Sequence, residues 1–192
     1  MKQALRSLAL LSSSFMVLLS GCSQLSPQLI SLNTDVESAI NAPVTLSVSV
    51  TDNRADNIIG YRGGVYSDTS TIQPKEPLQD QVADIVSELL VEGGATLTNA
   101  FPLYDIEISI DEFSYKTEPQ KANIMRSTAV AEMSIFINNG AKSFKNGFRT
   151  SEYIETFGYP NEQKNEQLLN GVFSSVIERM LSDPALEKFL AE

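Results

Sequence analysis

Three stretches of the chain alternate apolar and polar residues with a period of two, and this pattern constrains the fold more than any other feature of the sequence. They run from Val44 to Thr51, from Tyr104 to Asp111 and from Met125 to Ile137. Successive side chains of a β-strand point to opposite faces, so each stretch predicts a strand with one buried and one solvent-facing side. A fourth strand with looser alternation is expected over residues 142–157, where a β-bulge would account for the irregular pattern.

Two further segments repeat apolar residues at the spacing of an α-helix. The first begins at Pro77 and is followed by Gly93 and Gly94, residue types that typically start and end helices. The second covers residues 168–181, after which Asp183 is a suitable N-cap for a short additional helix.

The expected order of the main elements is therefore β-α-β-β-β-α. Strands with one polar face are typical of antiparallel sheets that are covered on one side. We predict an α+β fold with a mostly antiparallel sheet of about four strands and two main helices packed on one face. Residues 43–192 are long enough for a single domain with a sizeable core and too short for two ordinary domains.

The connection between the first strand and the first helix is unusually long. It spans residues 52–76 and is rich in Gly, Asp, Ser and Thr. Connections of this length are usually functional or contain small elements of their own. Residues 58–61 and 70–72 are expected to pair as a small hairpin.

Five residues of this connection are candidates for binding a partner. Asp52 and Arg54 leave the strand two positions apart, and a local ion pair that braces the loop is favoured over a binding site. Tyr61 and Tyr66, together with Arg62, could form a contact surface, because tyrosine buries apolar area while keeping a polar tip. We expect this loop to be the recognition element.

The N-terminus has the pattern of a cleaved export signal. Lys2 and Arg6 precede an apolar run over residues 8–19, which is too short to span a bilayer as a permanent helix. The run ends in Leu-Ser-Gly-Cys, which resembles the lipobox of bacterial lipoproteins. This resemblance implies cleavage between Gly21 and Cys22 and attachment of diacylglycerol to the cysteine thiol. An ordinary secretory signal that happens to contain a cysteine is the alternative.

Lipidation of Cys22 would attach the mature chain to a membrane through its N-terminal acyl chains, palmitate among them. Two or three chains give stable anchoring where one alone is marginal. The next residue is Ser23. By resemblance to lipoproteins of Gram-negative bacteria, a residue other than aspartate at this position implies the outer membrane, with the domain facing the periplasm.

Residues 1–21 are thus expected to be the signal peptide and residues 22–42 a flexible tether. The tether is rich in Ser, Gln and Asn, and a flexible chain of this length has a reach of roughly 25 Å. The short apolar set Leu29, Ile30 and Leu32 could dock on the domain instead, which would shorten that reach.

The charge of the chain excludes one class of partner. Removal of residues 1–21 takes away two of 14 basic residues and none of 24 acidic residues, so the formal charge changes from −10 to −12. Such a surface repels nucleic acid and anionic headgroups. Membrane association is therefore expected to come from the acyl chains, and no nucleic acid is expected among the partners.

The composition also excludes the common catalytic sites. The chain has no histidine, which excludes serine–histidine triads and histidine metal sites. Its single cysteine is used for lipid, so thiolate chemistry is absent as well. The remaining option is a pair of carboxylates, Asp105 and Glu107, with Asp111 further along the same strand face. Carboxylates in this arrangement are far more often simply solvated.

A calcium site formed by Asp52, Asp56 and Asp68 is also disfavoured, because their spacing does not match an EF-hand loop. We therefore expect no enzymatic activity, no metal site and no cofactor.

The chain resembles the YajG family of bacterial lipoproteins over essentially its whole length. The resemblance rests on the Leu-Ser-Gly-Cys end of the signal and on the alternating strand that runs into Asp52-x-Arg54. It continues with the helix entered at Pro77 and with the final segment, residues 186–190. Membership of this family would imply an envelope location and no particular activity.

These observations favour a lipid-anchored, non-enzymatic binding or scaffolding module that acts with a protein partner in an envelope complex. The alternative is a periplasmic carrier or binder of a lipid or glycan, which would require a cavity between the sheet and the helices. An enzyme that relies on Asp105 and Glu107 is the weakest hypothesis.

Overall fold

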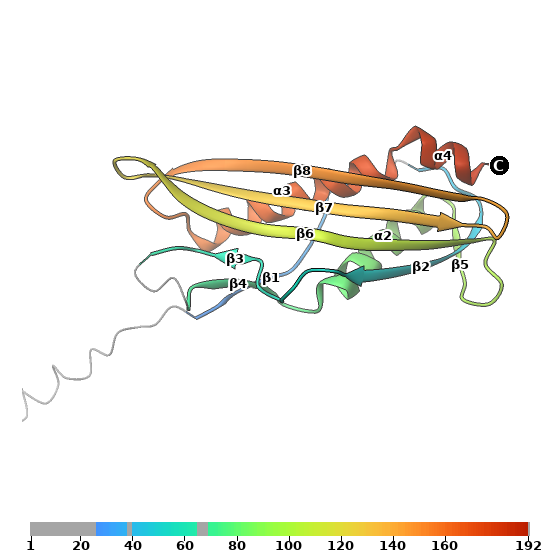
Figure 1. Cartoon of the computed structure of the whole chain (residues 1–192), viewed down its shortest axis with the longest axis horizontal. Helices are drawn as coiled ribbons and strands as arrows, with labels where there is room; N and C mark the ends of the chain where they lie inside the picture. The colour runs from blue at the N-terminus through green and yellow to red at the C-terminus, as the bar shows by residue number, and fades with distance from the viewer. Residues whose placement is uncertain (1–25, 38–39, 65–68, 192) are drawn as a thin grey trace, which may run out of the picture.

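The computed structural model describes residues 26–37, 40–64 and 69–191. In these residues a curled, mixed β-sheet of eight strands is covered on one face by helices (Figure 1). The elements in chain order are β1 (Gln28–Ile30), β2 (Thr45–Asp52), β3 (Gly60–Tyr61), β4 (Thr71–Pro74), α2 (Leu78–Glu92), β5 (Thr96–Leu97), β6 (Tyr104–Lys121), β7 (Ile124–Asn138), β8 (Ser143–Phe157), α3 (Glu162–Leu181) and α4 (Pro184–Leu190).

The long strands β6, β7 and β8 form an antiparallel meander, and the shorter strands lie on the other side of β6. The first part of β6 pairs in parallel with β2, which in turn pairs in parallel with β5. Further along, β6 pairs with β3, and the sheet continues through β4 to β1. One strand thus joins two groups of short strands at its two ends.

The prediction of a mostly antiparallel, four-stranded sheet was wrong. The connection between β2 and β6 contains α2, and a helical crossover brings the chain back to the end of the sheet where it started, so the two strands run in parallel. The sequence pattern also missed two short strands, because two or three residues cannot establish a period of two. The missed strands are β1 and β5.

Local predictions held better than the topology. The two helices and the capped short helix α4 are present, with the Asp183 side chain accepting from the amide of Ala185 at 2.9 Å. The hairpin expected in the long connection is confirmed by antiparallel pairing of β3 with β4. The bulge expected in β8 was wrong, since the register of β7 with β8 is continuous and a shift instead occurs in β6 between Ile110 and Glu112.

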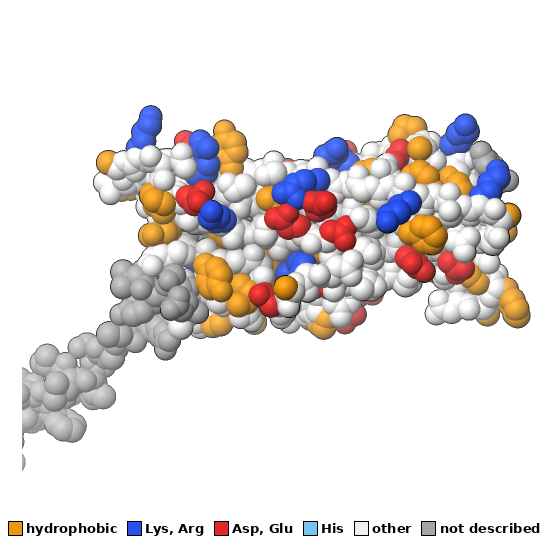
Figure 2. All heavy atoms as spheres, in the orientation of Figure 1, with side chains coloured by type: hydrophobic (Ala, Val, Ile, Leu, Met, Phe, Trp, Pro, Cys, Tyr) orange, Lys and Arg blue, Asp and Glu red, His pale blue; other side chains and the backbone are white. Residues whose placement is uncertain are grey.

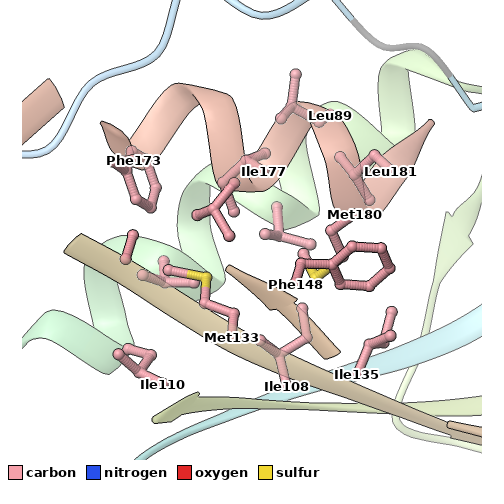
Figure 3. Packing of buried hydrophobic residues seen from close by; sticks show 14 of the residues in the cluster. Leu89, Ile108, Ile110, Met133, Ile135, Phe148, Phe173, Ile177, Met180 and Leu181 are labelled. Atoms are coloured by element: carbon pink, nitrogen blue, oxygen red, sulfur yellow. The ribbon is translucent and has the colours of Figure 1, made fainter. Parts of the chain in front are cut away.

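The core lies between the inner face of the sheet and the helices. Figure 3 shows Ile108 of β6, Met133 of β7 and Phe148 of β8 facing Phe173 and Ile177 of α3. These side chains are fully or nearly fully buried. The alternation read from the sequence therefore identified the inner faces of β6 and β7 correctly.

The residues that precede β2 are partly built into this domain. The strand β1 pairs in parallel with β4, and Ile30, Ile40 and Ala42 are buried in the core. Of the apolar set that could dock, Ile30 is buried, Leu32 packs at the edge of the core and Leu29 is exposed. The domain boundary at residue 43 stays a prediction, but docked chain extends back to Ser26.

The molecule is elongated along its three long strands (Figure 1). One end, the Ser26 end, contains Ser26, Tyr61, the β6–β7 turn and the residues around Phe157. The opposite end, the Phe101 end, contains the loop of residues 97–103 and the β7–β8 turn. This division positions the candidate sites described below.

Candidate functional site

Asp52 and Arg54 form an ion pair at the end of β2. The Arg54 guanidinium donates from Nε to Oδ1 of Asp52 at 3.0 Å and from Nη2 to Oδ2 at 2.8 Å. Its Nη1 reaches the carbonyl oxygen of Phe113 on β6 at 3.5 Å. Only 7% of the Arg54 side chain and 18% of the Asp52 side chain are exposed. The pair therefore braces the start of the long connection against β6.

Arg62 is buried at the Ser26 end, where it joins three segments. Its Nη1 donates to Oε1 of Glu162 at 2.6 Å, and its Nη2 donates to the carbonyl oxygen of Ser26 at 2.5 Å. The Arg62 amide donates to the carbonyl of Ser70 at 2.8 Å. Arg62 thus ties β3 to the first turn of α3 and to the chain just before β1.

A chain of buried hydrogen bonds lies beside this ion pair. The Tyr115 hydroxyl donates to Oδ1 of Asn165 at 2.6 Å, and Nδ2 of Asn165 donates to Oε1 of Gln28 at 2.9 Å. On the other side, Thr117 donates to the Tyr115 hydroxyl at 3.2 Å and shares a hydrogen bond of 2.7 Å with Ser127. Burial raises the pKa of Tyr115 above 10.0, and hydrogen bonds with Ser127 and Thr117 oppose this shift. The network fixes β1 against α3, β6 and β7.

The same end exposes three aromatic side chains. Phe157, at the end of β8, is 81% exposed, and Tyr61 and Tyr159 are about half exposed. Tyr159 lies over the backbone of Gly63, where an added Cβ would come within 2.3 Å of the ring. Gly63 also has a φ of +79°, so glycine is favoured there by conformation and by space. Among the loop candidates that the structure describes, Tyr61 is the one with a largely exposed side chain.

Several predicted site residues lie outside the described residues. They are Gly21 and Cys22 at the expected cleavage and lipidation site, and Tyr66 and Asp68 in the long connection.

The carboxylates of β6 lie on the outer, solvent-facing side of the sheet. Asp105, Glu107 and Asp111 are all exposed. Ser47 donates to Oδ1 of Asp105 at 2.6 Å, and Ser134 donates to Oδ2 of Asp111. No group of three or more His, Cys, Asp or Glu side chains that could hold a metal ion occurs among the described residues. These carboxylates therefore lie on a solvent-facing strand face.

A second charged cluster occupies the middle of this face. Nη1 of Arg149 contacts Oε2 of Glu112 at 2.6 Å and also contacts Glu132. In Figure 2, basic and acidic side chains lie side by side across the middle of the molecule. The hydroxyl of Ser114, which donates to Glu112 at 2.6 Å, and Arg149 lower the pKa of the Glu112 carboxyl, while burial opposes the shift. The two carboxylates raise the pKa of Arg149.

The Phe101 end carries an exposed apolar tip that the sequence analysis did not single out. Leu97, Phe101 and Leu103 are 38%, 98% and 57% exposed. Phe101 has a φ of +60°, a left-handed conformation that side chains other than glycine rarely adopt. The loop is nevertheless held at both sides of β2, since the Thr98 amide donates to the Leu46 carbonyl and the Leu103 amide donates to the Thr45 carbonyl, both at 2.9 Å.

The only sequence signal for this tip was a pair of large apolar residues inside a turn-forming segment. Apolar residues next to a proline, here Pro102, are equally compatible with a buried turn. Exposure therefore became visible only in the folded chain.

The hollows found in the described residues lie at the surface. One of about 680 Å³ is lined by residues 33–37 and by the polar side of α3, and another of about 300 Å³ lies on the outer face between Glu107, Asp111 and Lys145. The space between sheet and helices is instead filled by packed apolar side chains (Figure 3). No helix of the described residues is long and apolar enough to cross a membrane.

Comparison with protein families gives one match, to a model described as an uncharacterized lipoprotein, over residues 31–191. No curated protein matches the sequence.

Among solved structures, the fold is similar to that of protein XCC0632 from Xanthomonas campestris, at 10% identity and a TM-score of 0.50, with 87% of this chain and 95% of that chain covered. Rare lipoprotein B from Shewanella oneidensis matches at 12% identity and a TM-score of 0.45, covering 76% of this chain and 96% of that chain. A minor lipoprotein from Acinetobacter baumannii matches at 8% identity and a TM-score of 0.41, with 78% and 91% covered. The first of these likenesses shows a shared fold.

Proposed function

The chain belongs to the lipoprotein family that matches residues 31–191, and from this premise we propose that it is a lipid-anchored, non-enzymatic binding module that holds a protein partner in an envelope complex. The family implies anchoring to the envelope through lipid. The specific partner surface is the apolar tip formed by Leu97, Phe101 and Leu103.

The anchor of this proposal is Cys22. The Leu-Ser-Gly-Cys sequence supports cleavage after Gly21 and acylation of the cysteine. Ser23, rather than aspartate, supports delivery to the outer membrane, with the domain in the periplasm.

One observation carries the choice of partner surface. Phe101 is 98% exposed, and the loop that presents it is fixed to β2 by backbone hydrogen bonds on both sides. A large apolar side chain gains nothing from full exposure, and contiguous apolar patches commonly mark interaction sites. The left-handed backbone of Phe101 adds a conformational cost that a glycine would avoid. Interfaces are enriched in aromatic anchors of this kind.

The candidate residues of the long connection are less suited to bind a partner than the apolar tip. Three of them form ion pairs or hydrogen bonds inside the domain through their charged groups, namely Asp52, Arg54 and Arg62. Tyr61 remains accessible, but it lies at the Ser26 end, away from the apolar tip, and is not assigned to the protein partner surface.

No catalytic role is proposed, because Asp105 and Glu107 face solvent on an open strand face. The carrier alternative receives no support from the filled space between sheet and helices, since an apolar ligand requires a concave site of several hundred Å³ there.

In-cell crosslinking tests the proposal. A photoreactive amino acid replaces Phe101 in the full-length chain, and the matched control carries it in place of Tyr153, which is 61% exposed on the outer face of β8. We expect one discrete protein adduct from position 101 and none of that mass from position 153. The same adducts from both positions, or an adduct to lipid at position 101, would contradict a partner surface at the tip.

A further inference from the structure

The Ser26 end of the domain is tethered at short range. Arg62 holds the carbonyl of Ser26 at 2.5 Å, and Gln28 donates from Nε2 to the carbonyl of Glu162 at 2.8 Å. Docked chain therefore reaches back to Ser26, only four residues after Cys22. Four residues span at most about 14 Å even when fully extended. A tether of the expected 20 residues would have left the domain free to turn in any direction, whereas four residues do not.

The surface next to this attachment point is aromatic. Phe157 pairs with Ile124 at the β6–β7 turn, and the amide of Gly158 donates to the carbonyl of Asn123 at 2.7 Å. Two residues later, the ring of Tyr159 packs over the loop that follows β3. The three exposed rings of Tyr61, Phe157 and Tyr159, with Lys121 at the tip of the turn, define what we call the aromatic end surface.

Charge does not oppose contact of this surface with a membrane, although the mature chain is strongly acidic. Lys121, exposed at the tip of the β6–β7 turn, adds a positive charge to the surface. Three carboxylates near this end are each neutralised by a cation with an N···O distance of 2.6 Å, in the pairs Glu118–Lys116, Glu155–Arg126 and Glu162–Arg62.

We propose that the aromatic end surface lies on the lipid bilayer, with Phe157 and Tyr159 in the headgroup region. This inference rests on the lipid anchoring at Cys22 proposed above. Aromatic side chains are enriched at membrane–water interfaces, where an apolar ring and a polar tip are both accommodated. The headgroup region of a leaflet is roughly 5–8 Å deep, a depth that an aromatic side chain spans and that lies within the reach of a four-residue link.

The contact also orients the domain. The 18 residues of β6 run from the Phe101 end to the Ser26 end, and at about 3.3 Å per residue they span roughly 55 Å. With the aromatic end surface on the bilayer, the apolar tip at the opposite end points away from it. The partner is then held tens of ångströms from the lipid surface.

The chain has no tryptophan, so a single introduced tryptophan reports on its own surroundings. F157W places this probe on the aromatic end surface, and F101W places it at the opposite end as the matched control. Both positions are highly exposed, so both variants are expected to fold. The lipidated full-length proteins are reconstituted into vesicles of phosphatidylethanolamine and phosphatidylglycerol, and into the same vesicles made with lipids brominated in their acyl chains.

We expect brominated lipid to reduce the emission of F157W about twofold or more, with a shift to shorter wavelength, and to leave F101W unchanged. Equal and weak quenching of both variants in protein that floats with the vesicles would overturn the bilayer contact and leave lipid anchoring intact. Blue-shifted emission of F157W without quenching would indicate a protein occupant of the surface and would likewise overturn it. Failure of the wild-type protein to float would remove the anchor premise itself.

Discussion

The two ends of the molecule differ in what they bury. At the Ser26 end, buried polar and charged groups are linked by hydrogen bonds: Arg62, Tyr115 and Asn165 hold the first docked residues to the sheet and to α3, although Nε of Arg62 has no hydrogen-bond partner among the described residues. At the Phe101 end, backbone hydrogen bonds hold a loop whose apolar side chains face solvent. Buried polar networks fix a single arrangement because any alternative leaves donors unpaired. Exposed apolar groups stabilise nothing until a partner covers them.

This contrast indicates that the two ends have different roles. The Ser26 end determines how the domain leaves its anchor, and a rigid connection there is useful only if orientation matters. The Phe101 end presents a fixed apolar surface at the end of the molecule opposite the Ser26 end (Figure 1). If this is so, substitutions at the Ser26 end should lower the free energy of unfolding, whereas substitutions at the Phe101 end should not.

The largest effect is expected from Asn165→Ala. Asn165 is fully buried, and its removal leaves the proton of the Tyr115 hydroxyl without its acceptor and Oε1 of Gln28 without its donor. Unsatisfied buried groups cost about 1–3 kcal/mol each, so we expect a loss of roughly 3 kcal/mol in the free energy of unfolding. Urea denaturation measures it, with Gln167→Ala at an exposed position of the same helix as the control. A loss below that of the control would show that the network is not what holds this end together.

Tyr115→Phe should cost less, about 1–2 kcal/mol, because only the hydroxyl is lost. It should also change the response to alkaline pH. The pKa of Tyr115 is raised above 10.0 in the folded chain, so its stabilising effect is complete below pH 10 and is lost as the pH rises through the folded pKa. Wild-type protein should therefore lose more stability than Tyr115→Phe above pH 10 in thermal unfolding. Parallel pH profiles would contradict the assignment.

At the Phe101 end, the substitution Phe101→Gly should raise the free energy of unfolding instead of lowering it. The left-handed φ of +60° suits glycine, so we expect a gain of up to about 1 kcal/mol in stability. Partner capture from the apolar tip should nevertheless fall, as measured by crosslinking from Leu103. A destabilised variant would mean that Phe101 packs usefully in the free protein, and the contrast between the ends would weaken.

The smallest effect is expected between the two ends, on the outer face. Ser114 and Arg149 lower the pKa of Glu112, so its stabilising effect is present above the model-peptide value of 4.5 and is lost as the pH falls through the folded pKa. Glu112→Gln should cost about 0.5 kcal/mol at pH 7, since the cluster is largely exposed. The difference from wild type should disappear in acid, which chemical denaturation at pH 7 and pH 3 would detect. A difference that persists at pH 3 would point to packing instead of charge.

The sequence was informative wherever local chemistry decides the outcome. Alternation over Tyr104–Asp111 and Met125–Ile137 identified the inner and outer faces of two long strands, because side-chain direction in a strand follows from backbone geometry alone. Asp183 and Pro77 likewise marked helix starts correctly, since capping depends on neighbouring residues only. The Asp52–Arg54 pair was anticipated for the same reason.

The candidate site was predicted less well. Arg62 was expected to face a partner, yet its charge is spent on Glu162, a residue 100 positions later. Phe101 and Phe157 were not singled out, because an apolar residue in a turn or at a strand end gives no sign of which neighbours will cover it. Both depend on contacts between distant segments.

By itself, the sequence determined that the chain belongs to a lipoprotein family, the excess of acidic charge and the class of each long element. Only the tertiary structure decided that β2 runs parallel to β6, that the chain docks from Ser26 onward and that the two ends expose different apolar surfaces. The physical reason is the sequence separation over which each interaction acts. Periodicity and capping act over a few residues, whereas pairing, burial and exposure depend on which distant segments pack together.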